Sequence, residues 1–343
     1  MATLRHGVIG CAGIGLTHAD AVQTVDGVKL VACSDVDEQA AEEFADAYDC
    51  GAYTDVGEMV ADADVDAVSV CTPSGTHADV TVEAARAGAD VLCEKPLDVY
   101  ADRIDRMIRV CEEEGVTLAG VFQKRTHENA QVAKAAVEDG DIGDLVLGDT
   151  HVKWFRSQGY YDSGGWRGTR DMDGGAMMNQ AIHAIDRLQW LMGGVESVTA
   201  LTDTLQRDLE CEDTAAVALR FENGSLGTIE ATTAVKGGTD RTEINGTEGT
   251  VGLAGQALTT FEVGTGEESD YGAETESRAV EIEEAEWPEP HVRVVRDFVD
   301  ALREGREPMV PAREAREAVD VILAAYESAD RGEPVALDDV RGD

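Results

Sequence analysis

The chain of 343 residues is poor in lysine, aromatic residues and long apolar runs. Aromatic residues make up 5% of it, and six of its 28 basic residues are lysines, at positions 29, 95, 124, 134, 153 and 236. It lacks a run of about twenty uncharged apolar residues, the length that a membrane-spanning helix needs. The first ten residues also lack the apolar core of a signal peptide. We therefore expect a cytoplasmic protein without a membrane partner.

The cysteines do not form a disulfide or metal-binding pattern. Seven are present, at positions 11, 33, 50, 71, 93, 111 and 211, and no two form a C-x-x-C pair. An odd number without such spacing is typical of reduced, buried thiols. Because His, Cys and carboxylate residues show no ligand spacing either, the sequence predicts no metal site.

Acidic residues dominate the charge. There are 69 Asp and Glu against 28 Lys and Arg, a formal net charge of −41. Such a chain repels nucleic acid and anionic lipid, so neither is an expected partner. The excess of acid and the scarcity of lysine resemble the composition of halophilic proteins. In molar salt the Debye length is about 3 Å, so the repulsion between their acidic groups is screened. An ordinarily acidic enzyme is the alternative.

Hydrophobic patterning divides the chain into two domains. Up to Val121, short Val-rich runs alternate with amphipathic segments at 37–47, 76–87 and 101–114. This is the pattern of buried parallel strands joined by helices, so residues 1–123 are an expected Rossmann domain of the α/β class. Residues 124–343 are the expected domain for substrate binding and oligomerisation, with the alternative that the C-terminal helices pack back on the Rossmann domain.

The second domain is expected to be α+β, with a large, mostly antiparallel, open sheet. Two Asn-Gly pairs, at 223–224 and 245–246, lie between β-prone runs and indicate hairpins. An open sheet needs a cover on its exposed face, so a homodimer or homotetramer is expected. The expected strands are 145–155, 197–206, 214–221 and 225–233, and the expected helices are 128–137, 176–192, 291–303 and 312–330.

A glycine-rich turn follows the first strand. In Gly10-Cys11-Ala12-Gly13-Ile14-Gly15, small residues allow a tight turn, close approach of a pyrophosphate and packing of the next helix, whose amino end would hold the phosphates. Asp35 lies twenty residues after Gly15, where a carboxylate can accept from both ribose hydroxyls of NAD. No basic residue follows it, which favours NAD over NADP. Alternatively, Asp35 only caps the next helix.

Two further motifs complete a family resemblance: Cys71-Thr72-Pro73-Ser74-Gly75-Thr76-His77, and Glu94-Lys95-Pro96. Together with the glycine turn they resemble the Gfo/Idh/MocA family, which includes glucose-fructose oxidoreductase and inositol dehydrogenase. The resemblance covers nearly the whole chain and places Lys95 beside the nicotinamide and the substrate hydroxyl; a surface lysine is the alternative. It implies that Thr72, Pro73, His77, Glu94, Lys95 and Gln123 line the cofactor site.

A second chemical segment opens the expected long helix. It runs from Gly174 to Asp186 and spaces Asn179, His183 and Asp186 at i, i+4 and i+7, on one helical face. His183 can accept the proton of a sugar hydroxyl as hydride leaves, while Lys95 polarises the same oxygen. A core or capping histidine is the alternative.

Asn179 departs from the Asp of inositol dehydrogenase-like members. Because Asn cannot take a proton, it can only orient the substrate or the imidazole. The Met-Asn-Gln-x-x-His form resembles the branch that oxidises the 3-hydroxyl of nucleotide-linked N-acetylglucosaminuronic acid or related glucosides.

Aromatic residues concentrate between positions 154 and 168, where Trp166 can stack on a sugar and Arg156 and Arg167 can pair with a carboxylate or phosphate. Packing of a domain interface is the alternative for the aromatic residues. Arg125 follows the last Rossmann strand and, by the resemblance, lines the same cleft.

The sequence thus predicts an NAD-dependent oxidoreductase that transfers hydride between a secondary alcohol of a sugar or nucleotide-sugar and nicotinamide. The alternatives within the family are an inositol, polyol, diol or aldose dehydrogenase. The alternative from another class is a non-catalytic regulator that senses NAD.

Overall fold

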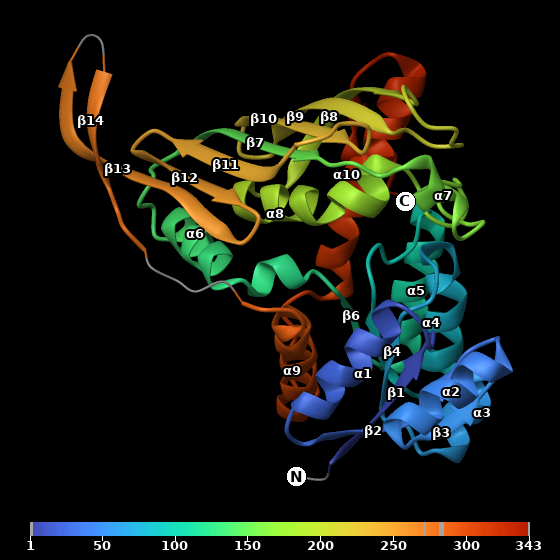
Figure 1. Cartoon of the computed structure of the whole chain (residues 1–343). Coiled ribbons are helices and arrows are strands. Elements are labelled where there is room, and N and C mark those ends of the chain that lie inside the picture. Colours follow the sequence, from blue (N-terminus) through green and yellow to red (C-terminus); the bar gives the residue numbers. More distant parts are fainter. Residues whose placement is uncertain (1–2, 270–271, 281–284, 342–343) are drawn as a thin grey trace. The chain divides into compact units, whose positions relative to one another are not determined.

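The computed structural model describes residues 3–269, 272–280 and 285–341. They form two compact units: Met1–Gln123 with Glu286–Arg316, and Lys124–Ala285 with Glu317–Asp343. Figure 1 shows the elements of both. Among the residues that the structure describes, no helix has both the length and the apolar character needed to cross a membrane.

The first unit contains a six-stranded parallel sheet in the order β3-β2-β1-β4-β5-β6. This is the strand order of a Rossmann domain, and its switch point lies between β1 and β4. The strands are β1 (Leu4–Ile9), β2 (Val28–Ser34), β3 (Gly51–Tyr53), β4 (Ala67–Val70), β5 (Asp90–Cys93) and β6 (Leu118–Gly120). The predicted parallel α/β domain is confirmed.

Helices alternate with these strands: α1 (Ile14–Thr24), α2 (Glu38–Tyr48), α3 (Val56–Asp62), α4 (His77–Arg86) and α5 (Ala101–Glu114). Side-chain caps fix two of their starts, because Asp37 accepts from the Gln39 amide and Asp55 from the Glu58 amide. A later helix, α9 (Glu289–Glu304), packs beside α1 (Figure 1). The first unit therefore uses a segment far along the chain.

The second unit is built on a nine-stranded sheet in the order β14-β13-β12-β11-β7-β10-β9-β8-β15. All its pairs are antiparallel except β7 with β10. Its strands are β7 (Leu145–Lys153), β8 (Val195–Asp203), β9 (Thr214–Phe221), β10 (Leu226–Thr232), β11 (Asp240–Gly246), β12 (Gly249–Ala254), β13 (Ala257–Ser269), β14 (Gly272–Ser277) and β15 (Val335–Ala336). The predicted mostly antiparallel sheet is confirmed.

The two Asn-Gly pairs behave differently. Asn223 and Gly224 form the turn between β9 and β10, with Gly224 at φ +87°. Asn245 instead pairs with Thr250 inside the ladder of β11 and β12, so that turn falls at residues 247 and 248. Both hairpins exist, but the second turn lies two residues later than its motif.

Helix α8 (Ile182–Met192) packs on one face of this sheet, against β7 and β11 (Figure 1). Arg187, 1% exposed, anchors it by donating to Asp240 at 3.0 Å and to Thr242 at 2.8 Å. The other helices are α6 (Glu128–Glu138), α7 (Gln158–Asp162) and α10 (Ala312–Arg331), whose first five residues belong to the first unit.

The expected single helix over 176–192 is wrong in its first part. Ala176–Ala181 form a π-helical turn, and the α-helix begins only at Ile182. The wider turn changes the angular spacing between Asn179 and His183 that a regular helix would give. Such π turns are frequent at functional sites, which is consistent with the chemistry expected here.

Candidate active site

In the first unit the glycine turn has the geometry that phosphate binding needs. Gly10 has φ +98°, and a Cβ on it would lie 2.7 Å from the Cys71 carbonyl oxygen. A Cβ on Gly15 would lie 2.0 Å from the Gly10 carbonyl oxygen, so α1 can start this close to the strand only with glycine there. Gly13 is the residue before α1, and Ile14 is its first residue. The turn leaves the amino end of α1 open to an anion.

A pocket of about 290 Å³ lies beside this turn. Five of the expected cofactor residues line it: Gly10, Ala12, Asp35, Thr72 and Pro73. They come from the carboxyl ends of β1, β2 and β4, where open α/β sheets bind their ligands. The residues present therefore fit a dinucleotide.

Asp35 is fixed by backbone hydrogen bonds. Its Oδ2 accepts from the Cys11 amide at 2.8 Å and its Oδ1 from the Asp37 amide at 3.0 Å. The cap of α2 is Asp37, so the capping role considered for Asp35 is wrong. The carboxylate instead links the end of β2 to the glycine turn.

The Glu-Lys-Pro motif follows β5 at the same edge of the sheet. Glu94 is 6% exposed, and its Oε1 accepts from His18 Nε2 at 3.0 Å. His77 is 1% exposed and places its ring nitrogens 2.7 Å from the Pro96 carbonyl oxygen and 2.8 Å from that of Thr72. Lys95 thus lies between two residues with buried partners. Gln123 ends the first stretch of this unit, in a short turn of residues 123–126.

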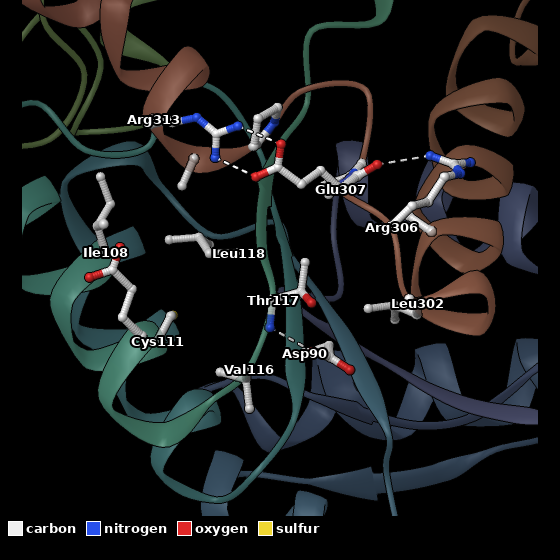
Figure 2. Close-up of a pocket in the computed structure, with 16 residues that line it drawn as sticks. Asp90, Ile108, Cys111, Val116, Thr117, Leu118, Leu302, Arg306, Glu307 and Arg313 are labelled. Atoms are coloured by element: carbon white, nitrogen blue, oxygen red, sulfur yellow. Dashed lines mark hydrogen bonds and ion pairs between the residues drawn. The ribbon is translucent and has the colours of Figure 1, made fainter.

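Another pocket of the first unit has a volume of about 510 Å³, and Figure 2 shows the residues that line it. Asp90, at the start of β5, lines it and accepts from the Thr117 amide at 2.6 Å. Arg313 and Glu307 pair at its rim (Figure 2). Because it is at the amino end of β5, we do not assign it to the cofactor.

In the second unit a hydrogen-bonded series joins the aromatic segment to the π-helical turn. Arg167 donates to the Tyr160 hydroxyl at 2.6 Å, and Gln180 donates to the same hydroxyl at 3.2 Å. Gln180 also donates to the side-chain oxygen Oδ1 of Asn179, and the side-chain amide of Asn179 donates to Asp173. The structure therefore brings the expected substrate residues Arg167 and Asn179 into one network.

Cations gather around the same aromatic rings. The Arg167 guanidinium lies 4.5 Å from the ring centres of Tyr160 and Trp166, and that of Arg156 lies 5.3 Å from Tyr160. Arg156 also lines a hollow of about 270 Å³ together with Lys153. In a chain of net charge −41 this is a local concentration of positive charge suited to an anionic group.

His183 lies one turn after Asn179 and is partly buried. Asp186 does not share an open face with it: Asp186 is fully buried and accepts from Arg125 at 2.7 and 3.0 Å. Arg125 is itself 2% exposed and lies 5.4 Å from the Trp190 ring. This pair fixes α8, so we interpret Arg125 as a support of His183.

Sequence reasoning missed Glu212, which lies under the π-helical turn. Its carbonyl accepts from the Ala176 amide at 2.9 Å and its Oε1 from the Met177 amide at 2.8 Å. A Cβ on Gly175 would lie 1.8 Å from Glu212 Oε2, which explains the second glycine of the pair. Burial raises the pKa of Glu212 to about 7. No local pattern around residue 212 indicates this contact.

Comparison with known proteins agrees with both units. Residues 4–122 match a family model described as oxidoreductase family, NAD-binding Rossmann fold, and residues 134–337 match the model of its C-terminal alpha/beta domain. The chain is 32% identical to myo-inositol 2-dehydrogenase of Thermotoga maritima over 99% of this chain and all of that one. It is 29% identical to D-xylose 1-dehydrogenase (NADP(+)) 2 of Haloferax volcanii, over 98% of this chain and all of that one.

Among solved structures, the WlbA dehydrogenase of Bordetella pertussis, in complex with NADH and UDP-GlcNAcA, is 34% identical with a TM-score of 0.85. That match covers 97% of this chain and 98% of the other. The predicted family, the predicted NAD cofactor and the predicted enzyme class are confirmed. The chain belongs to the Gfo/Idh/MocA family of NAD-binding oxidoreductases.

Proposed function

We propose that this oxidoreductase acts on a secondary alcohol of a sugar that carries an acidic group, with a nucleotide-linked sugar as the leading candidate. The observation that carries the proposal is the network that joins Arg167, Tyr160, Gln180 and Asn179. It combines aromatic faces for a sugar ring with guanidinium groups for a carboxylate or phosphate. The related WlbA structure contains UDP-GlcNAcA, a ligand with both features.

Each residue has a role that its chemistry permits. Bound NAD supplies the acceptor for the hydride that leaves the alcohol carbon. Lys95 polarises the hydroxyl oxygen, and His183 takes the hydroxyl proton, so that the carbon becomes a carbonyl. Asn179, held by Asp173 and Gln180, orients the substrate through hydrogen bonds and does not titrate. Arg156, Trp166 and Arg167 hold the sugar and its anionic group.

NAD is favoured over NADP by the charges around the pocket beside the glycine turn. Asp35, Asp55 and Glu83 line this pocket. Val36, the residue after Asp35, also lines it and is 97% exposed. A 2′-phosphate there would meet carboxylates and no guanidinium. The Haloferax relative is named for NADP, so the cofactor test below includes both forms.

An inositol or polyol dehydrogenase is the second candidate, because the Thermotoga relative is named for myo-inositol. A panel of UDP-linked N-acetylhexosamine derivatives, uronic acids, inositols and aldoses, with NAD or NADP in molar KCl, separates the two. We expect reduction of NAD to be fastest with the acidic, UDP-linked sugars. Faster turnover of myo-inositol would favour the second candidate, and NAD binding without turnover of any alcohol would favour a regulator.

We further propose a homodimer or homotetramer that forms through the sheet of the second unit. The outward face of β8, β9 and β10 exposes Leu201 (77%) and Leu226 (47%) together with Ala216 and Ala218. Charged side chains such as Glu196, Arg220 and Glu230 share this face. Light scattering in molar KCl should give two or four chains per particle, and Leu201→Lys should lower that number. A monomeric parent protein would contradict the proposal.

A reducing cellular interior fits the thiols, since all seven cysteines are free. We therefore propose a cytoplasmic location. The acidic composition supports an interior rich in potassium salt.

A further inference from the structure

We propose that two buried histidines, His18 and His77, position Lys95 by holding the peptide groups on both sides of it. The proposal rests on the proposed role of Lys95 at the substrate hydroxyl. His18 holds Glu94, the residue before Lys95, and His77 holds Pro96, the residue after it. All of these residues belong to the first unit.

Glu94 is an anion held inside the protein. Burial by itself would raise its pKa, but hydrogen bonds from His18 and His291 outweigh burial and hold the pKa well below its usual range. His18 Nε2 lies 3.0 Å and His291 Nε2 lies 3.6 Å from the same oxygen, Oε1. The other oxygen, Oε2, accepts from the backbone amide of Lys95 at 3.1 Å. The anion therefore ties the Lys95 peptide to two helices, α1 and α9.

The neighbours of His18 define its tautomer. Its Nδ1 lies 2.9 Å from Ser69 Oγ, which lies 2.9 Å from His6 Nε2. Burial lowers the pKa of His6 to about 3, so His6 is neutral. His6 Nδ1 is buried without a hydrogen-bond partner, and placing the proton on Nε2 avoids an unpaired N–H. Donation then runs from His6 to Ser69, from Ser69 to His18, and from His18 to Glu94.

This series connects Lys95 to the cofactor site. His18 is on α1, the helix whose amino end follows the glycine turn. The helix end that would hold the phosphates and the peptide of Lys95 are thus linked by one hydrogen bond, between His18 and Glu94. The hydrogen bond therefore holds the backbone of Lys95 in a fixed position relative to the helix end that would bind the cofactor phosphates.

His77 fixes the other side. Its Nδ1 lies 2.7 Å from the Pro96 carbonyl oxygen and its Nε2 lies 2.8 Å from the Thr72 carbonyl oxygen. Carbonyl oxygens only accept, so each contact is a hydrogen bond when the ring nitrogen that faces it carries a proton. Burial raises the pKa of the fully buried Asp98, while backbone hydrogen bonds and the nearby Arg103 and His77 act in the opposite direction. His77 thereby joins the pocket residue Thr72 to the Glu-Lys-Pro motif.

The test compares His18→Leu and His77→Leu with the parent enzyme and with the control His151→Gln, which changes a histidine in the second unit. Turnover is followed with NAD and UDP-GlcNAcA, and with NAD and myo-inositol. A displacement of about 1 Å can lower a rate by roughly 100-fold, so we expect that loss in kcat with KM for NAD nearly unchanged. The rate at which acetic anhydride acetylates Lys95 gives a readout without substrate, with the other five lysines as internal references. We expect the acetylation rate of Lys95 to change at least threefold in both histidine variants.

The double variant Glu94→Gln/His18→Leu separates positioning from stability. It removes the buried charge together with its donor, so the melting temperature should recover relative to His18→Leu while kcat stays low.

Recovery of kcat together with stability in the double variant would overturn the proposal, as would unchanged acetylation of Lys95 in both single variants. One equivalent of zinc that is lost in His18→Leu would instead make His18, Glu94 and His291 a metal site, since their ligand atoms lie within 4.8 Å of one another. Full turnover by Lys95→Ala would defeat the proposed function alone, because acetylation of Lys95 in the histidine variants does not depend on turnover.

Discussion

Replacement of Lys95 by alanine should lower kcat by about 1,000-fold, which is within the range that a positioned acid or base contributes. The side chain lies at the carboxyl end of β5, the edge where the glycine turn and Asp35 also lie. Without its ammonium group, negative charge developing on the substrate oxygen would lose the stabilisation that we propose for Lys95. The measurement is the rate of NAD reduction with the best substrate of the panel, together with NAD binding by calorimetry.

Two further variants sharpen this result. Lys95→Arg keeps the positive charge but spreads it over a larger, planar guanidinium that cannot take the place of the compact ammonium beside the hydroxyl oxygen, so it should recover little of the lost rate. Lys29→Ala removes an exposed lysine of β2 and should have the activity of the parent enzyme. Full turnover by Lys95→Ala, with its fold intact, would remove Lys95 from the mechanism.

Short-range features of the site could be predicted because the motif itself contains the physical constraint. Gly15 is needed because a Cβ there would meet the Gly10 carbonyl oxygen of the same turn, and Gly10 is needed because it has a positive φ. Asp35 directly follows β2, and this position could be predicted because the strand and the turn after it are encoded within a few residues. The choice between cofactor ligand and helix cap was open in the sequence, and it required the observed cap at Asp37 to exclude one of them.

Long-range contacts could not be predicted in the same way. His18 and Glu94 are 76 residues apart in the sequence. His291 belongs to the segment Glu286–Arg316, which is part of the first unit but follows Lys124–Ala285 of the second unit along the chain. Each looks like an ordinary buried or surface residue in its own sequence context. Only the sheet order and the packing of α9 on α1 bring them together.

The π-helical turn is another feature that the local sequence does not predict. Periodicity predicts a continuous helix through Asn179 and His183, but the amides of Ala176 and Met177 donate to Glu212. Glu212 is 35 positions away from Met177 in the sequence, so the local sequence pattern does not predict this contact. The geometry of the candidate active site therefore depends on a buried carboxylate that the motif lacks.

Glu212 leads to a prediction on stability and pH. Burial raises its pKa to about 7, and the neighbouring Asp213 raises it further, while hydrogen bonds from the Met177 amide and Tyr326 act in the opposite direction. In the unfolded chain the carboxyl would have its ordinary pKa of about 4.5. Between these two values the folded protein keeps a proton that the unfolded chain has released. Stability should therefore fall as the pH rises through this window, by up to about 3 kcal/mol once the pH exceeds 7.

Glu212→Gln should remove this loss, because a neutral amide can accept from Met177 without placing a charge in the interior. Relative to the parent protein, the variant should gain stability as the pH is raised from 5 to 8, and its melting temperature should be higher at pH 8. Denaturation at constant KCl concentration measures the difference, with Glu114→Gln at an exposed position of α5 as the control. A difference between variant and parent that stays constant with pH would show that Glu212 does not titrate in this range. If the difference instead follows the pH as expected, Glu212 beneath the turn that holds Asn179 titrates in this range, and activity at high pH should be more robust in the variant than in the parent enzyme.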